Sequence, residues 1–236
     1  MLTRLDTRSK LLLSLAGLFV TSLVVGDLIG VKLFVVGGTT FSAGFIPFPI
    51  TFLLTDLLNE FYGKKVARAV TWVGFSMAVF TLIILTIAVS LPPSPITEAA
   101  DWTGVRQPDF EKVFGGSRRI LVASMVAYLF AQFTDIWVFN RLKAVTHGRL
   151  LWLRATGSTV FSQLIDTVVI QTLAWQDALD VRVLVGLIVS SYLGKLVIAV
   201  GLTPLVYLGH GVVTRWLGIP PVALDAAGNP VEPAPT

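Results

Sequence analysis

Six long apolar stretches run through this sequence and limit the folds open to it. A transmembrane helix needs about 20 mostly apolar residues to cross a hydrocarbon core roughly 30 Å thick. The chain is 54% hydrophobic and only 14% charged, whereas an ordinary soluble domain is roughly 25% charged. We therefore predict an all-α integral membrane protein with six transmembrane helices. The stretches lie near residues 11–29, 45–61, 66–91, 120–139, 155–175 and 183–208.

The positions of lysine and arginine predict the direction in which these helices cross. Short loops rich in Lys and Arg stay in the cytoplasm. With six crossings, most basic residues fall on the side of the two termini, fewer fall on the other side, and Lys195 lies inside the last stretch. Both termini are therefore predicted to be cytoplasmic. The terminal side holds Arg4, Arg8, Lys10, Lys64, Lys65, Arg68, Arg141, Lys143, Arg149, Arg154 and Arg215, and the other side holds Lys32, Arg106, Lys112, Arg118, Arg119 and Arg182.

The net charge of +4 is accounted for by this topology. A nucleic-acid-binding protein gathers its basic residues on one soluble face, and here they are scattered between apolar stretches. We therefore expect no nucleic-acid partner. The chain also has no cysteine, which excludes disulfides, thiolate metal sites and a cysteine nucleophile.

The segments outside the apolar stretches have patterns of their own. Residues 35–40, Val-Val-Gly-Gly-Thr-Thr, are typical of a short β-hairpin between the first two helices. The outer segment 92–117 begins with Pro-Pro-Ser-Pro, which cannot continue a helix, and we expect it to cap one outer face. The final residues are rich in Pro, Ala and Gly and have no periodic apolar face. We therefore divide the chain into one transmembrane domain, 1–217, and a disordered cytoplasmic tail, 218–236.

Four aspartates lie within or at the edge of the apolar stretches: Asp27, Asp56, Asp135 and Asp166. A charged side chain at the middle of a membrane helix costs roughly 2.5 to 3.5 kcal/mol on insertion scales. We expect these aspartates to face a polar interior, to be paired or to be protonated, and Lys195 is the cation available inside a stretch. The alternative is that they only join neighbouring helices.

The order of the polar residues suggests a repeat. Asp27 and Asp56 are separated by nearly the same number of residues as Asp135 and Asp166. Two halves of three helices each would then be related by an inverted repeat, a recurring plan of transporters with a site near the midplane. Gln-x-x-Asp also occurs twice, at 132–135 and 163–166, and residues three apart share a helix face. A chance match of spacing is the other interpretation.

Asp56, Asn59 and Glu60 in the second stretch share one helix face by the same spacing rule. We expect Asp56 and Asn59 to face the path of a substrate. Glu60 lies nearer the cytoplasmic end, where it either pairs with Lys64 four residues later or belongs to the cytoplasmic exit.

Catalytic and cofactor motifs are missing from the sequence. It contains no GxxxxGK[ST] phosphate loop, no HExxH and no GxSxG. Its two histidines, His147 and His210, do not have the spacing of a metal site. We therefore expect a protein that is not an enzyme and that carries no metal or other cofactor.

The stretch 49–64, Pro-Ile-Thr-Phe-Leu-Leu-Thr-Asp-Leu-Leu-Asn-Glu-Phe-Tyr-Gly-Lys, resembles the signature of the queuosine precursor transporter family, also called the vitamin uptake transporter family. Gly44 and the segments 132–142 and 158–167 agree with it, and the resemblance covers roughly residues 10 to 210. It implies a bacterial inner-membrane carrier that imports 7-deazaguanine bases such as preQ0, preQ1 or queuine.

The polar residues suit such a substrate. A carboxylate can accept hydrogen bonds from the adjacent N–H donors of a guanine-like edge, and an amide can hydrogen-bond the carbonyl oxygen and the ring nitrogens. A flat ring also prefers aromatic walls. We predict substrate contacts from Asp56, Asn59, Gln132, Asp135, Gln163, Asp166, Phe52 and Phe133, and a coupling or ion-pair role for Asp27, Glu60 and Lys195.

The source of energy is left open by the sequence. A secondary or facilitative carrier is favoured first, since a carboxyl group removed from water takes up a proton more readily. The alternatives are the substrate-capture subunit of an energy-coupling-factor importer and a membrane scaffold without transport. Besides lipid and the small-molecule substrate, a second copy of the chain is a conceivable partner, because Gly17, Gly194 and Gly201 permit close helix contact.

Overall fold

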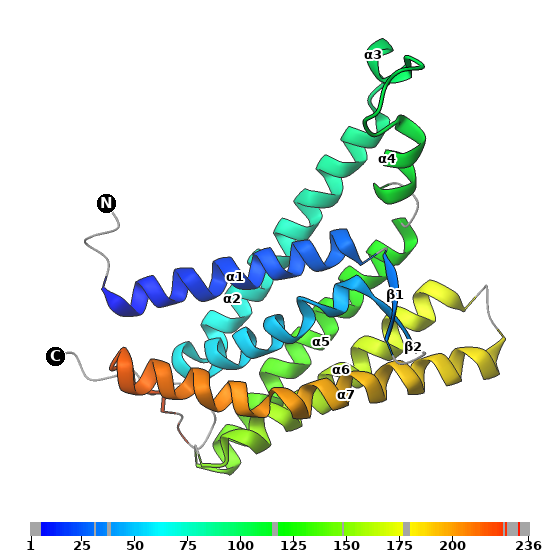
Figure 1. The fold of residues 1–236 in the computed structure, drawn as a ribbon. Coiled ribbons are helices and arrows are strands. Elements are labelled where there is room, and N and C mark those ends of the chain that lie inside the picture. The colour runs from blue at the N-terminus through cyan, green and yellow to red at the C-terminus, as the bar shows by residue number, and fades with distance from the viewer. Residues whose placement is uncertain are drawn as a thin grey trace.

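The computed structural model describes residues 6–30, 32–36, 39–114, 118–147, 149–176, 180–223, 225 and 231. Long helices pack side by side into a bundle (Figure 1). The helices of the described residues are α1 (Thr7–Ile29), α2 (Phe48–Ser90), α3 (Pro95–Glu98), α4 (Gln107–Phe114), α5 (Arg118–Val145), α6 (Leu151–Trp175) and α7 (Val181–Gly211).

Four of the described helical segments are long and apolar enough to cross a membrane, judged by length and composition. Large apolar side chains such as Phe80, Ile84 and Val197 are exposed on these segments, as expected for side chains that meet lipid. The chain is therefore an all-α, multi-pass membrane protein. The four segments are Thr7–Ile29, Ala43–Ser90, Val122–Val145 and Val181–Trp216.

Helix α2 contains two of the six predicted crossings, because the chain reverses inside it at Gly63. Gly63 has φ 78° and ψ 173°, a conformation open essentially to glycine alone. The first arm, 48–62, lies in the bundle, and the second arm, 64–90, extends beyond it (Figure 1). Helix α6 covers the fifth predicted crossing but is not among the four segments above, so the number of six crossings stays a prediction.

Two short strands precede α2, in agreement with the predicted hairpin. β1 (Leu33–Val36) and β2 (Thr39–Ser42) pair antiparallel, with Leu33 opposite Ser42; residues 37–38 lie outside the described part of the chain. A 3₁₀ turn, Ala43–Phe45, then leads into α2.

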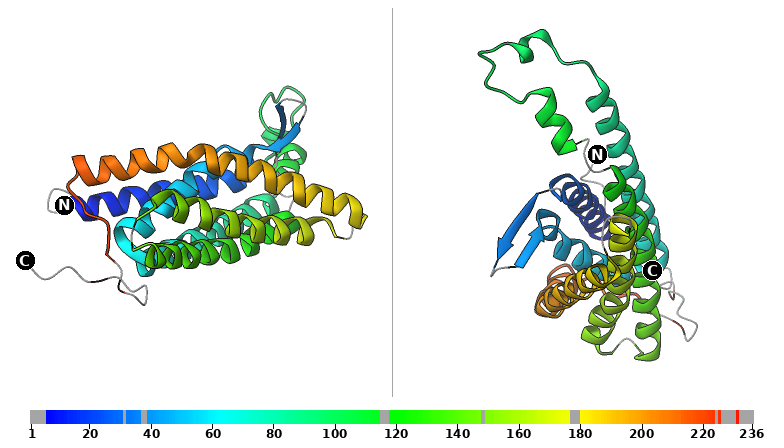
Figure 2. Two further views of the ribbon diagram at one scale, coloured as in Figure 1. Left: turned by 90° about the horizontal axis from the view of Figure 1, so that it is seen from below. Right: turned by 90° about the vertical axis from the view of Figure 1, so that its right-hand side faces the viewer.

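The outer segment after α2 does not cover a face of the bundle as we expected. It forms α3 and α4 at the far tip of the second arm of α2 (Figures 1 and 2). The side-chain nitrogen of Gln107 on α4 donates to the carbonyl oxygen of Val89 at 3.0 Å. This hydrogen bond ties the segment to the end of the arm. Helix α2 ends there because the segment begins with prolines, which cannot continue a helix.

The core of the bundle lies where α1, the first arm of α2 and α5 meet. Phe19, Leu58, Phe61 and Ile136 are almost completely buried there. Helices α5 and α6 pack as a pair joined by a short loop, and α7 packs on α6 and α2. Helix α1 begins and helix α7 ends at the same end of the bundle (Figures 1 and 2).

The residues directly after α7 return to the bundle. A π turn, Val212–Trp216, follows α7, and Ile219 beyond it is buried in the core. The backbone N–H of Val222 donates to the carbonyl oxygen of Glu60 at 2.9 Å. These contacts lie in residues 218–236, which the composition predicted to be a disordered tail. The composition gave no sign of them, because they are made by single apolar residues that show no helical or strand periodicity. Most of the residues after 223 are not described.

Candidate functional site

Polar side chains gather inside the bundle where the first arm of α2, α5 and α6 meet. These helices are joined there by hydrogen bonds and buried carboxyl groups rather than by apolar contacts alone. We call the following residues, all buried, the interior polar cluster: Thr55, Asp56, Gln132, Asp135, Ser158, Ser162 and Gln163.

The contact between α2 and α5 forms one side of the cluster. The Thr55 hydroxyl lies 3.3 Å from the side-chain oxygen of Gln132, in hydrogen-bonding geometry. Asp56, the next residue on α2, is buried within electrostatic range of Asp135 on α5. The predicted substrate residues Asp56, Gln132 and Asp135 are therefore brought together by the fold.

The contact between α5 and α6 forms the other side. The Ser162 hydroxyl donates to Asp135 Oδ1 at 3.2 Å, and Ser158 lies within interaction range of this carboxyl group. Ser158 and Ser162 are four residues apart and so share one face of α6. Helix α6 thereby fixes the orientation of Asp135.

Several atoms of the cluster have no hydrogen-bond partner within the described part of the chain. They are Asp56 Oδ1, Asp135 Oδ2 and both polar side-chain atoms of Gln163. Buried polar groups are nearly always partnered, and leaving one unpaired costs about 1 to 3 kcal/mol. Unpaired carboxyl and amide groups inside a membrane protein are typical of a site that binds a polar ligand.

A small cavity adjoins the cluster. It has a volume of about 20 Å³, roughly enough for a single water molecule. Phe52 and Asp56 of α2, Thr159 of α6 and Thr203 of α7 line it. Gln163 lies four residues after Thr159 on the same face of α6. A fused-ring base cannot fit in this volume, so the structure has a closed interior.

Asn59 and Phe133 are placed differently from the cluster. The side-chain oxygen of Asn59 accepts from the side-chain nitrogen of Asn140 at 3.0 Å, which links α2 to α5 one turn away from Asp56. Phe133 is half-buried, and its ring packs 5.5 Å from that of Trp72, which is exposed. The ring contact of Phe133 in the described part of the chain is thus with Trp72 and not with another predicted substrate residue.

Asp166 belongs to a second polar group, near the start of α2. It forms an ion pair with Lys195 of α7, and the Lys195 ammonium lies 5.2 Å from the centre of the Phe48 ring. Asp27 lies within electrostatic range of Asp166 and accepts from the Ser124 hydroxyl at 3.4 Å. Among the described residues, Asp166 thus contacts Lys195 and Asp27 rather than Asp56 and Asp135, although its Gln-x-x-Asp motif suggested one common site.

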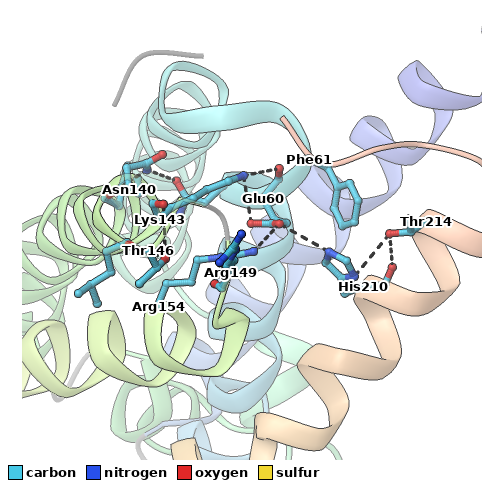
Figure 3. A network of polar contacts seen from close by, with 12 residues as sticks. Glu60, Phe61, Asn140, Lys143, Thr146, Arg149, Arg154, His210 and Thr214 are labelled. Atoms are coloured by element: carbon cyan, nitrogen blue, oxygen red, sulfur yellow. Dashed lines mark hydrogen bonds and ion pairs between the residues drawn. The ribbon is translucent and has the colours of Figure 1, made fainter. Parts of the chain in front are cut away.

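Glu60 is the centre of a third polar group, which is shown in Figure 3. Its carboxylate lies 2.6 Å from Arg154 Nη2 and 3.1 Å from Lys143 Nζ. His210 Nε2 lies 3.6 Å away. All three groups are from helices distant in sequence, whereas the sequence offered either a pair with Lys64 or a place at the cytoplasmic exit. A cavity of about 690 Å³ opens beside these residues.

Sequence reasoning missed Lys143 and Arg154 as partners of an interior acid. Both were assigned to basic loops, but both are buried, with 4% and 2% of the residue exposed. Their position just before or after an apolar stretch is only weak evidence for burial, because a charged side chain at a helix end can reach the interior as easily as the solvent. Asn140, which is also buried and directly follows an apolar stretch, was missed as well.

Comparison with known proteins gives a consistent result. The family described as “Putative vitamin uptake transporter” matches residues 42–209. The chain is 33% identical over 195 residues to the “Probable queuosine precursor transporter” of Bacillus subtilis (strain 168), a match that covers 81% of this chain and 82% of the relative. It is 32% identical over 124 residues to the “Queuosine precursor transporter” of Escherichia coli (strain K12), covering 52% of this chain and 50% of the relative. No solved structure matches the chain.

The matched region contains the interior polar cluster, the Asp166–Lys195 ion pair, and Glu60 with its partners Lys143 and Arg154. It excludes all of α1, the last two residues of α7 and everything after α7. Because the family match extends over most of the chain and one relative is aligned over four-fifths of both sequences, the chain belongs to the queuosine precursor transporter family, the vitamin uptake transporters.

Proposed function

We propose that this protein imports queuosine precursors, 7-deazaguanine bases such as preQ0, preQ1 or queuine, across the bacterial inner membrane. The interior polar cluster is the proposed binding site. The observation that carries the proposal is the set of unpaired carboxyl and amide atoms on Asp56, Asp135 and Gln163 inside an apolar helix bundle. The names of the relatives support the substrate class.

The chemistry of these atoms fits a guanine-like ring edge. Carboxylate oxygens accept only, so Asp56 Oδ1 and Asp135 Oδ2 suit neighbouring N–H donors. An amide both donates and accepts, so Gln163 suits a carbonyl oxygen or a ring nitrogen. Phe52, which lines the adjoining cavity, supplies an aromatic wall for the flat ring.

The proposed topology has six crossings with both termini in the cytoplasm. The two arms of α2 on either side of Gly63 count as separate crossings, with α1, α5, α6 and α7 as the other four. An even number of crossings agrees with α1 beginning and α7 ending at the same end of the bundle (Figure 2). The inverted repeat of three helices stays a prediction.

The closed interior implies a transport cycle. A cavity of about 20 Å³ cannot admit a base, so α2, α6 and α7 must separate around the site for substrate to enter and leave. We propose that the protein does this alone, as a secondary or facilitative carrier. The group of Asp27, Asp166 and Lys195 is a candidate for proton coupling, since its charges are held inside the bundle next to the cavity-lining Phe48.

Uptake by purified protein in liposomes tests this proposal. We expect saturable accumulation of a radiolabelled 7-deazaguanine base without any ATPase subunit, faster when an inward proton gradient is imposed. Liposomes without protein provide the background. Retained binding with no uptake would replace the carrier by a capture subunit of a larger importer. Absence of both, from folded protein, would overturn the proposed function.

A further inference from the structure

Glu60 ties together four helices at the end of the bundle where α1 begins and α7 ends. The acid is on α2, and its ion partners Lys143 and Arg154 are on α5 and α6. His210 on α7 approaches the same carboxylate (Figure 3). The Arg154 guanidinium also donates to the carbonyl oxygen of Arg149 at 2.9 Å, which fixes its position.

The same turn of α2 also holds α1 and the segment after α7. The Glu60 carbonyl oxygen accepts from Lys143 Nζ at 3.1 Å and from the Val222 N–H at 2.9 Å. The Phe61 carbonyl oxygen accepts from Arg8 Nη2 at 2.7 Å, and the Tyr62 hydroxyl donates to the Arg8 carbonyl oxygen at 2.6 Å. Side chains from α1, α5, α6 and α7 therefore all contact this turn of α2.

This turn separates two cavities that are stacked along the same helices. The small cavity is lined on α2 by Asp56, and the large one by Glu60, one helical turn or about 6 Å further along. The boundary falls between adjacent residues on the other two helices: Ala155 and Arg154 on α6, and Val206 and Tyr207 on α7. In each of these pairs the first residue lines the small cavity and the second lines the large one.

We propose that Glu60, Lys143 and Arg154 form a gate that closes the passage between the interior site and the large cavity. The gate is shut when the carboxylate holds both cations, as in this structure, and it opens when the pairs separate and become hydrated. A buried ion pair suits this role, because its attraction is largely offset by the loss of hydration, so exchanging partner for water changes the free energy little. The inference rests on the proposed transport path but not on the identity of the substrate.

Residues 219–223 form the outer part of this gate. Gly218, at φ +67°, turns the chain back after α7. Ile219 is buried against the core, and Pro221 and Val222 line the large cavity. The segment is therefore placed to hold the Glu60 turn in its closed position through the Val222 N–H.

The absence of cysteine in the chain allows a direct test. Thr156 lines the small cavity, so a Thr156→Cys variant reports whether that cavity is open. A membrane-impermeant thiol reagent is added to inverted and to right-side-out vesicles in separate experiments. With Glu60→Gln added, we expect the reaction to accelerate about tenfold, reflecting a tenfold larger open population, and only from the face that carries the termini. Glu98→Gln, on the exposed helix α3, is the matched control and should leave the rate unchanged.

Glu60→Gln leaves two buried cations without their counter-charge, which can unfold the protein. A second variant therefore tests the gate without removing a charge. Val222→Pro removes one backbone donor and no charge, and should accelerate the reaction roughly two- to threefold. Size-exclusion profiles verify that each variant is folded. Unchanged rates in the folded variants, or acceleration only from the opposite face, would overturn the gate. Neither result requires a transported substrate, so the gate can fail while the proposed function stands.

Discussion

Asp166 and Glu60 each have a cationic partner inside the bundle, and this sets them apart from Asp56 and Asp135. The ion pairs of the described residues join Asp166 to Lys195 and Glu60 to Lys143, Arg154 and, when its ring is protonated, His210, and include none to Asp56 or Asp135. An acid whose charge is neutralised by a neighbouring cation is suited to a structural or gating role. The acids without one remain for a ligand, as the unpaired oxygens of Asp56 and Asp135 indicate.

The Asp166–Lys195 pair can be tested by removing one or both charges. Lys195→Met leaves an uncompensated acid, and should lower the free energy of unfolding by about 3 kcal/mol, or the thermal midpoint by roughly 6 to 12 °C for a chain of this size. The double variant Lys195→Met with Asp166→Leu should recover most of this loss, because packed apolar residues can replace a buried pair. Thermal unfolding of the detergent-purified proteins measures both. Equal losses in the single and double variants would show that packing, not charge, is responsible.

Among the helices, α2 departs most from regular geometry, and Gly63 is the cause. Any residue with a side chain is strained at φ 78° and ψ 173°. Gly63→Ala should therefore lower the free energy of unfolding by about 1 to 3 kcal/mol, and should disturb the neighbouring Glu60 turn.

A matched control is Gly17→Ala in the middle of α1, where an added Cβ would meet nothing within 4 Å. This change should leave stability unchanged or raise it by up to about 1 kcal/mol, because alanine favours helix. The two variants are compared by thermal unfolding in the same detergent. Equal changes in stability at Gly63 and Gly17 would contradict the conclusion that the reversal of the chain requires glycine at position 63.

The sequence was most informative for elements and least for contacts between them. Apolar length placed α1, both arms of α2, α5, α6 and α7, and the Gly-Gly pattern placed the hairpin. Local patterns could not show that Arg154 reaches Glu60 across 94 positions of the chain, or that Ile219 packs into the core. Such contacts depend on how separate helices meet, which spacing along one helix does not determine.

For the molecule as a whole, three residues of α2 mark three successive levels of the bundle. Phe48 lies against Lys195, Asp56 lies in the interior polar cluster, and Glu60 lies at the proposed gate. Part of this site was predicted: Asp56, Gln132, Asp135 and Gln163 are buried as expected. Asp166 and Phe133 contact Lys195 and Trp72 instead, because a shared motif or an aromatic type does not determine which neighbour a residue meets.

The most direct test of the interior polar cluster as the substrate site is equilibrium binding of a free 7-deazaguanine base to the purified protein. Saturable binding is predicted for the natural chain and for Asp101→Asn, a change in the exposed outer segment. Asp135→Asn keeps the shape of the side chain but loses a charged acceptor, so its affinity should fall by about 10- to 100-fold. No saturable binding by the folded natural chain, or equal affinity in the folded Asp135→Asn variant, would contradict the site proposed for this family member.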